Sequence, residues 1–189
     1  MKSGVRALGV AESYRGDRST IAGVVVRASR IVDGFSVSIA TVGGLDATEA
    51  VTALYDRLDR EDVRYVLLSG VAPAWFNILD LEAIHEHVDR PLLAVTYEES
   101  EGLESTIEAE FDGVERTERL ALYRSLPPRR EMTVNDETLF VRPVGVSLDE
   151  AEEILDAFTP EGGRPEPLRV ARLAARAFDA VRHRENHEA

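Results

Sequence analysis

Residues 5–42 read VRALGVAESYRGDRSTIAGVVVRASRIVDGFSVSIATV, and this stretch decides the fold. Three of its segments are rich in Val, Ile and Ala, a pattern typical of β-strands: 5–11, 19–28 and 31–42. Three strands that follow one another along the chain predict an antiparallel meander. The pair Asp33-Gly34 is typical of a tight turn, so the second and third strands have an alternative junction nearer Gly34.

Beyond the meander the sequence alternates between helical and strand patterns. Apolar spacing predicts helices at 46–60, 78–88 and 101–111, with buried strands at 63–69 and 91–97. Asp46 and Glu49 form a predicted capping box for the first helix, and Asn77 is the predicted N-cap of the second. This order indicates an α/β fold with a ribonuclease H-like mixed sheet. A doubly wound parallel sheet is the alternative, but it would not begin with a meander.

The remaining sequence predicts an elaboration, about 126–184, on a core of about 1–125, within a single domain 1–189. Segments 131–134 and 138–144 are expected to pair as a hairpin, and Ser147 with Glu150 forms a capping box before a helix that ends near Phe158. A last helix is predicted from Pro165 to about Arg184. Its apolar face comprises Leu168, Ala171, Ala175, Phe178 and Val181.

Composition excludes several classes of site. The 189 residues are 44% hydrophobic and 30% charged, which fits one globular domain with a sizeable core. Cysteine is absent, which excludes disulfides, thiolate zinc sites and cysteine nucleophiles. The sequence contains no apolar run of the roughly 20 residues that span a bilayer. We therefore expect a cytoplasmic protein with no membrane partner.

The charge balance predicts a salt-loaded environment. The formal net charge is -13, and Lys2 is the only lysine, so every other cationic side chain is arginine. Carboxylates stay well hydrated when salt competes for water, and their mutual repulsion is screened at molar ionic strength, where the Debye length is about 3 Å. We expect a halophilic archaeal source. An ordinary acidic bacterial protein is the alternative, but it does not explain the missing lysines.

Several phrases carry a resemblance that covers nearly the whole chain. They are Val5-Arg6-Ala7-Leu8-Gly9-Val10, Gly44-Leu45-Asp46-Ala47-Thr48, Trp75-Phe76-Asn77 with Asp80, Arg90-Pro91, and Pro165-Glu166-Pro167-Leu168-Arg169-Val170. In content and order they resemble the archaeal family of unknown function numbered ninety-nine, which is linked by name to endonuclease dU. That family is similar to endonuclease V, so the resemblance implies an endonuclease V-like fold of the ribonuclease H type.

The resemblance also implies a divalent metal, Mg²⁺ or Mn²⁺, held by carboxylates at the ends of the first and fourth strands. Hydrolysis of a phosphodiester uses such a cation to activate water and to offset developing charge. This chain departs from the pattern at two positions: Ala11 stands where the family carries an acid, and Ser69 where the nuclease relatives carry Asp. Glu12 remains as the predicted metal ligand, although adjacent strand residues point to opposite faces.

Three acids are the candidate catalytic residues: Glu12, Asp46 and Asp80. Each also has a purely structural interpretation. Glu12 fits a solvated strand end, Asp46 fits a helix cap, and Asp80 suits the first turn of a helix, where a negative charge complements the helix dipole.

Five residues are candidate nucleic-acid contacts: Trp75, Phe76, Asn77, Arg169 and Arg172. The aromatic pair lies in the loop after a buried strand, where open α/β sheets bind ligands, and it could stack on a base or close the end of the core. Arg169, Arg172 and Arg176 form a stripe at helical spacing, which suits either a phosphate track or intramolecular salt links.

The sequence is compatible with two functions. The first is a metal-dependent endonuclease-like protein of DNA repair that acts on deaminated or damaged nucleic acid. The alternative is a catalytically degenerate nucleic-acid-binding or scaffold protein with the same fold, which the replacements Ala11 and Ser69 favour. A small-molecule hydrolase or sensor is a third class, but no motif supports it.

Overall fold

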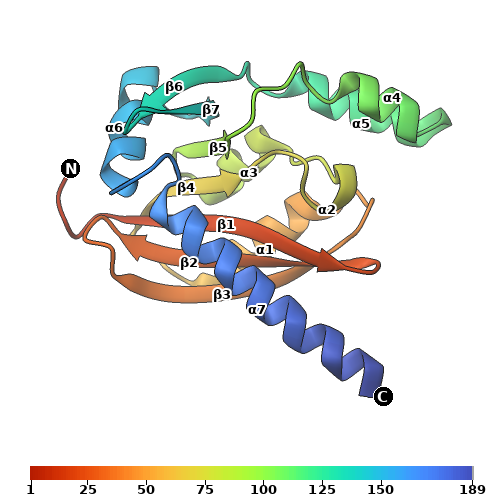
Figure 1. Ribbon diagram of the computed structural model, residues 1–189, viewed down its shortest axis with the longest axis horizontal. Helices are drawn as coiled ribbons and strands as arrows, with labels where there is room; N and C mark the ends of the chain where they lie inside the picture. The colour runs from red at the N-terminus through yellow and green to blue at the C-terminus, as the bar shows by residue number, and fades with distance from the viewer. Residues whose placement is uncertain (189) are drawn as a thin grey trace.

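A seven-stranded mixed sheet forms the centre of the computed structural model, which describes residues 1–188 and the side chains of 1–184. The strand order is β3-β2-β1-β4-β5-β7-β6 (Figure 1). The strands are β1 (Arg6–Arg15), β2 (Arg18–Arg27), β3 (Val32–Thr41), β4 (Val63–Ser69), β5 (Leu92–Thr96), β6 (Arg130–Val134) and β7 (Glu137–Val144). The predicted ribonuclease H-like mixed sheet is thus confirmed.

Strands β1, β2 and β3 form the predicted antiparallel meander. The alternative turn near Gly34 was wrong, because Gly34 lies within β3 and pairs with Val25. The chain instead turns at residues 28–31, where Arg30 takes a left-handed φ of 68° and the Arg27 amide donates to the Ile31 carbonyl. A left-handed residue closes this tight hairpin without the Asp-Gly pair.

Strand β1 also pairs with β4 in parallel, and β4 pairs with β5 in parallel. The register sets Val10 opposite Leu68 and Ser69 opposite Val95. Because the carboxyl ends of parallel strands meet at one edge of a sheet, the segments that follow β4 and β5 start side by side. This edge is where ligands bind in open α/β sheets.

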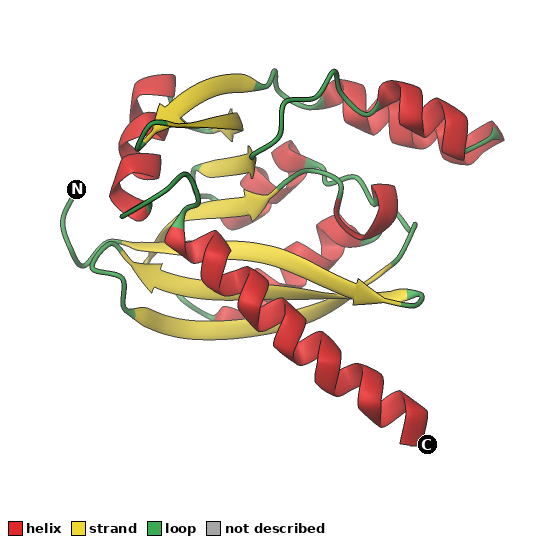
Figure 2. Cartoon of the chain, viewed as in Figure 1, coloured by secondary structure: helices red, strands yellow, loops and turns green. Residues whose placement is uncertain are grey.

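Helices cover both faces of the sheet (Figures 1 and 2). They are α1 (Ala47–Leu58), α2 (Pro73–Phe76), α3 (Leu81–Val88), α4 (Glu104–Glu110), α5 (Gly113–Ser125), α6 (Leu148–Phe158) and α7 (Glu166–Glu188). Helices α1 and α3 bury their apolar residues against one face, whereas α6 and α7 pack on the other. Helix α5 was not anticipated from the sequence. No helix in the described part of the chain has the length and apolarity needed to cross a bilayer.

Two predicted helix caps were wrong, although α1 does begin directly after Asp46 as expected. Asp46 makes no capping hydrogen bond to α1, because its carboxylate is taken up by Thr41 and Asn77. Helix α3 begins at Leu81 and is capped by Asp80, whose carboxylate accepts the Ala83 amide at 3.0 Å. Asn77 lies too early in the chain to cap α3, and its side chain binds the start of α1 instead.

The C-terminal hairpin and the cap of α6 are as predicted. Strands β6 and β7 pair through Asn135 and Asp136, which both take left-handed φ values, 50° and 64°, as a tight hairpin turn requires. The Ser147 hydroxyl accepts the Glu150 amide at 3.2 Å, so Ser147 caps α6.

Helix α7 lies across β1 and β2 (Figure 2). Gly9 makes this close approach possible, since a Cβ there would lie 2.2 Å from the Pro167 backbone. Leu168, Ala171 and Ala175 are buried as predicted. Phe178 and Val181 were wrongly assigned to the apolar face, because they are 45% and 56% exposed. The buried position in this turn is Asp179, whose carboxylate faces the polar ends of β1 and β2.

Candidate functional site

Ala11, Glu12 and Ser69 lie together at the carboxyl edge of β4. They line one small recess between β1, β4 and the loop that follows β4. Glu12 and Ser69 also border a much larger cavity of about 460 Å³. The first and fourth strands are therefore adjacent, as the ribonuclease H-like order predicts. The two replaced positions, Ala11 and Ser69, line the same recess.

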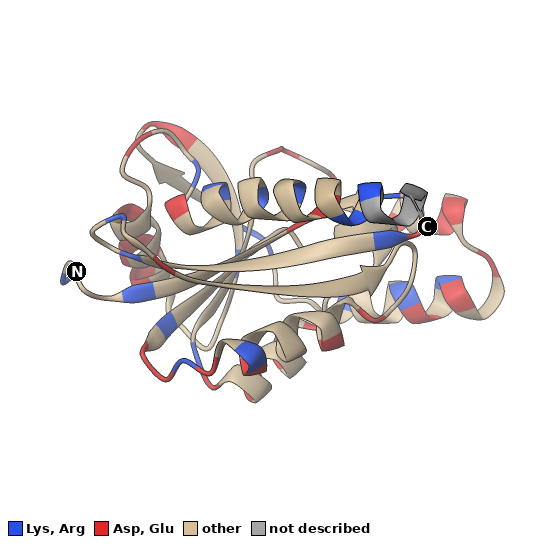
Figure 3. Cartoon of the chain, turned by 90° about the horizontal axis from the view of Figure 1, so that it is seen from below, with Lys and Arg blue, Asp and Glu red and all other residues tan. Residues whose placement is uncertain are grey.

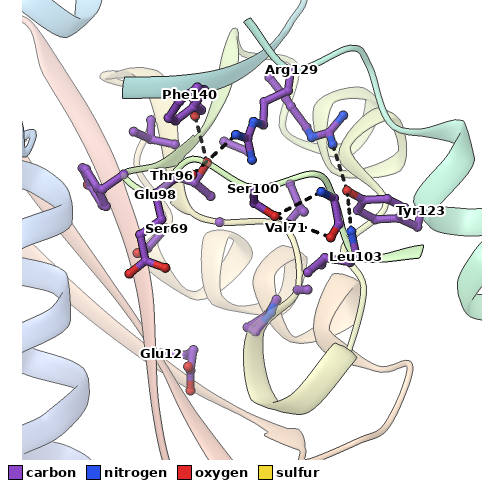
Figure 4. A pocket seen from close by; sticks show the side chains of 18 of the residues that line it. Glu12, Ser69, Val71, Thr96, Glu98, Ser100, Leu103, Tyr123, Arg129 and Phe140 are labelled. Atoms are coloured by element: carbon purple, nitrogen blue, oxygen red, sulfur yellow. Dashed lines mark hydrogen bonds between the residues drawn. The ribbon is translucent and has the colours of Figure 1, made fainter. Parts of the chain in front are cut away.

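The larger space, hereafter the arginine-lined cavity, opens beyond the ends of β4 and β5 (Figure 4). Its walls come from the loop after β4, the segment after β5, helix α5, strand β7 and helix α7. The view in Figure 4 has Thr96 and Phe140 from the sheet on one side and Tyr123 from α5 on the other. Gly70, with a φ of +86°, makes the turn that takes the chain away from β4 and leaves room for the cavity.

Glu12 is the predicted site acid that borders this cavity. Burial raises the pKa of its carboxyl above the usual value, although the Ser19 hydroxyl, which donates to it at 2.9 Å, and the nearby charge of Arg172 act to lower it. Desolvation penalises the charged form of a carboxyl, so Glu12 keeps its proton to a higher pH than an exposed glutamate.

Four arginines line the cavity: Arg129, Arg142, Arg164 and Arg172. Among the side chains described, none of the four forms an ion pair with a carboxylate, although the chain holds 35 acids and 22 Lys and Arg residues. Three of them stack on aromatic rings instead, with Arg129 4.1 Å from Phe140 and Arg164 4.2 Å from Tyr97. Positive charge that an acidic protein leaves unpaired in one cavity creates a local site for anions.

Tyr97 is a partly buried residue of the cavity wall, and its hydrogen bonding is incomplete. Its hydroxyl is shielded from solvent and has no hydrogen-bond partner in the described structure. Burial raises the pKa of Tyr97 to about 12, so the phenol stays protonated at neutral pH and can donate. A buried hydroxyl without a partner costs stability, and such groups in native proteins are commonly satisfied by a ligand, an ion or water.

Asp46 does not border the cavity. Its carboxylate accepts the Thr41 amide at 3.0 Å, the Thr41 hydroxyl at 2.7 Å and the Asn77 amide group at 2.7 Å. Partial burial raises the pKa of Asp46, but these hydrogen bonds outweigh it and leave the pKa below its usual value. The ionised carboxylate thus ties the end of β3 to the loop after β4.

The other predicted residues are dispersed. Asp80 caps α3, Asn77 is fully buried, and Phe76 packs edge-on against Phe111. Trp75 is 47% exposed and lies beside Gly43, on a segment in which Ala74, Trp75 and Phe76 take left-handed φ angles. Arg169 forms a salt link with Glu166 at 2.6 Å, whereas Arg172, three residues further along α7, borders the cavity. Basic residues recur along α7 (Figure 3).

The donor set does not match a divalent metal centre of the expected kind. Within side chains 1–184, no three His, Asp or Glu residues gather closely enough to hold an ion. Glu12 offers a carboxylate with a raised pKa, Ala11 offers no ligand atom, and Ser69 offers a neutral hydroxyl. Mg²⁺ and Mn²⁺ are held best by several anionic oxygens.

Sequence reasoning missed most of the cavity wall: Tyr97, Tyr123, Arg129, Arg142 and Arg164. Tyr97 is the last residue of the predicted strand 91–97. Its place at the carboxyl end of a buried strand, beside the loop after β4, could have identified it as a candidate site residue. The other four come from segments whose position relative to the sheet depends on how β7 pairs with β5. Local pattern does not encode that pairing.

Residues 3–179 match the family described as Endonuclease dU. A UPF0215 protein of Methanopyrus kandleri is 31% identical over 182 residues, covering 93% of this chain and 91% of the relative. One of Thermococcus kodakarensis is 32% identical over 163 residues, covering 85% and 82%.

Solved structures agree on the fold. A protein of unknown function from Archaeoglobus fulgidus superposes with a TM-score of 0.80 at 24% identity, covering 92% of this chain and 97% of that one. Ciona intestinalis endonuclease V, solved in complex with a DNA containing an inosine, gives a TM-score of 0.62 at 14% identity over 92% of this chain and 84% of that one. The match to 177 consecutive positions, 3–179, and the identity to UPF0215 proteins of archaea show that the chain belongs to the endonuclease dU family.

Proposed function

We propose that the protein binds nucleic acid and holds a nucleotide of a deaminated or damaged strand in the arginine-lined cavity. The observation that carries the proposal is the convergence of four arginines without carboxylate partners on one concave site. A chain of net charge -13 repels a polyanion over most of its surface, so binding needs a local positive field.

The cavity's chemistry suits a deaminated base. Deamination replaces an exocyclic amino group, which donates hydrogen bonds, by a carbonyl oxygen, which accepts them. Guanidinium groups only donate, and the protonated Tyr97 hydroxyl can donate as well. A wall rich in donors therefore favours the altered base over its parent. A volume of about 460 Å³ lies within the range of small-ligand pockets and is large enough for one nucleotide.

Stacking supplies a contribution that salt does not weaken as it weakens phosphate contacts. The flat guanidinium groups over Phe140 and Tyr97 offer surfaces at the cavity wall on which a base can lie, and the exposed ring of Trp75, outside the cavity, offers one for another base of the same strand. Base–aromatic stacking contributes about 1 to 3 kcal/mol per base.

A metal-dependent endonuclease is the second candidate, and membership of the endonuclease dU family favours it. In that case Glu12 would be the ligand nearest the reacting phosphate, with Asp46 and Asp80 as the remaining predicted acids. The described acids do not form the usual carboxylate cluster, so we assign no catalytic step to a metal. The binding function does not depend on one.

The two candidates separate in one set of measurements. Purified protein in concentrated KCl is titrated with labelled strands that contain deoxyuridine, inosine or no damage, and binding is followed by fluorescence anisotropy. Cleavage is scored on the same strands with Mn²⁺ or Mg²⁺ added. The variants are Glu12→Gln, Trp75→Ala and Arg142→Gln, with Arg116→Gln as a charge-matched control on the exposed face of α5.

Tighter binding of damaged strands, weakened by Arg142→Gln and Trp75→Ala but not by Arg116→Gln, would support the proposal. Equal affinity for all strands, or no binding, would contradict it. Metal-dependent cleavage that disappears in Glu12→Gln would establish the enzyme instead of a pure binding protein.

A further inference from the structure

Three hydrogen-bond donors meet at one end of the arginine-lined cavity without acceptors. The Tyr97 hydroxyl has no partner, and the charges of Arg164 and Arg172 both act on that phenol. Arg164 lies over the Tyr97 ring, and Arg172 lies close enough to Glu12 to lower its pKa. Within the described structure, neither guanidinium donates a hydrogen bond to a protein acceptor.

The other two arginines differ in this respect. Arg129 donates to the Glu98 carbonyl at 3.4 Å, and Arg142 donates to the Pro127 carbonyl and to the Tyr123 hydroxyl. Some of the N–H groups of Arg129 and Arg142 are therefore already used in hydrogen bonds that hold the wall of the cavity. The side-chain donors of Tyr97, Arg164 and Arg172 remain available to a ligand.

We propose that the Tyr97, Arg164 and Arg172 group binds the terminal phosphate of a nucleic-acid strand, a phosphomonoester at a strand end. The inference rests on the proposed nucleic-acid binding and narrows it to strands with a phosphorylated end. An internal phosphodiester carries one negative charge, whereas a phosphomonoester carries about -1.5 to -2 near neutral pH and offers three strong acceptor oxygens. Two guanidinium groups and one hydroxyl match that charge and that number of acceptors.

The surroundings favour such a ligand. The Tyr97 phenol remains protonated at neutral pH, so it donates rather than repels. Within the described structure, stacking on the Tyr97 ring is the contact that holds the Arg164 guanidinium, so rotation of this side chain can carry the guanidinium from the ring onto a phosphate.

The test compares one deoxyuridine-containing strand in four forms: 5′-phosphorylated, 3′-phosphorylated, unphosphorylated at both ends, and reduced to the free mononucleotide. Binding is measured for the unmodified protein, Tyr97→Phe, Arg172→Gln and Arg116→Gln. Removal of the Tyr97 hydroxyl deletes a buried group without a partner, so the melting temperature of Tyr97→Phe should stay equal or rise.

We expect at least tenfold tighter binding of one phosphorylated form than of the unphosphorylated strand, and loss of about tenfold of that preference in Tyr97→Phe and Arg172→Gln. Arg116→Gln should keep the preference. Equal binding of phosphorylated and unphosphorylated strands would overturn this inference while leaving the proposed function intact. Failure of every strand to bind would overturn both. Binding of the mononucleotide alone, with no strand bound, would assign the site to free nucleotides and also overturn the inference.

Discussion

The Ser19 hydroxyl donates to the Glu12 carboxylate across the β1–β2 pair, at 2.9 Å. Burial raises the pKa of Glu12, and this hydrogen bond is the strongest influence that acts in the opposite direction. Replacement of Ser19 by Ala should therefore raise the pKa of Glu12 further. NMR titration of carboxyl carbons measures it, with Glu12→Gln to identify the signal. A pKa that falls or stays the same would show that Ser19 does not hold the charged form.

Glu12→Gln should also change the dependence of stability on pH. The folded-state pKa of Glu12 is above the unfolded value of 4.5, so the folded state binds the proton more tightly. The free energy of unfolding therefore decreases as pH rises from 4.5 through the folded pKa. Glu12→Gln should remove this decrease and be more stable than the parent at neutral pH. Chemical denaturation at several pH values tests this, and an unchanged slope would contradict it.

Asp33 of β3 forms ion pairs with three arginines: Arg6 of β1 at 2.5 Å, Arg27 of β2 at 3.0 Å, and Arg60 of the segment between α1 and β4 at 3.2 Å. Hydrogen bonds from Arg27 and then Arg6 hold the pKa of Asp33 well below its usual range. The stability that this adds is present above the unfolded value of 3.8 and is lost as pH falls through the folded pKa.

Asp33→Asn should therefore lower the melting temperature at neutral pH and make stability less sensitive to acid. High salt should reduce the difference, since these groups are partly exposed. Asp17→Asn removes the same charge from an exposed turn and is the control. An equal effect of both variants would point to net charge alone.

Gly9→Ala should prevent α7 from docking in its present position. A Cβ at Gly9 would lie 2.2 Å from the Pro167 backbone, so the helix must shift away from β1. Overpacking of this kind costs about 1–3 kcal/mol, and a rigid backbone neighbour places this site at the upper end. Gly4→Ala, which meets nothing within 4 Å, is the control in a denaturant titration. Equal stability of the two variants would contradict the close approach.

Asn77→Ala tests whether the Asp46 cluster is structural. The buried Asn77 side chain accepts the Ala47 amide at 2.9 Å and donates to Thr41 and Asp46. Its loss leaves buried groups unpaired, at a cost of about 1–3 kcal/mol in the free energy of unfolding.

Asp46→Asn gives the matched comparison. If Asp46 acts only through this cluster, both variants lose stability, and strand binding measured well below their melting temperatures is retained. Loss of cleavage in Asp46→Asn with unchanged stability would instead identify Asp46 as catalytic.

The central sheet could be predicted because its signals are local. The meander, β4 and β5 each carry a continuous apolar pattern, and β1 lies beside β4 as the ribonuclease H-like order requires. The sequence therefore brings Ala11, Glu12 and Ser69 together correctly. The helix caps were harder to predict. Asp46 and Asn77 each have several possible hydrogen-bond partners, and tertiary contacts decide which of them is used.

The cavity could not be predicted to the same extent. Its arginines come from β6–β7 and the C-terminal segments, whose position follows from the pairing of β7 with β5. The predicted apolar face of α7 was also wrong in the C-terminal half of the helix, at Phe178 and Val181. There the sheet presents Ser13 and Thr20, so a buried Asp179 satisfies these hydroxyls better than Phe178 would.

Helix α7 has a consequence for the way in which the cavity is assembled. The cavity combines Glu12 of β1 with Arg172 of α7 and with Arg164, which lies just before α7, so these side chains come together only once α7 has packed against β1 and β2. A folding intermediate that has formed the sheet but has not docked α7 holds Arg129 and Arg142 but lacks the other two cations, so it should attract an anion more weakly. Docking of α7 over Gly9 therefore completes the cationic wall.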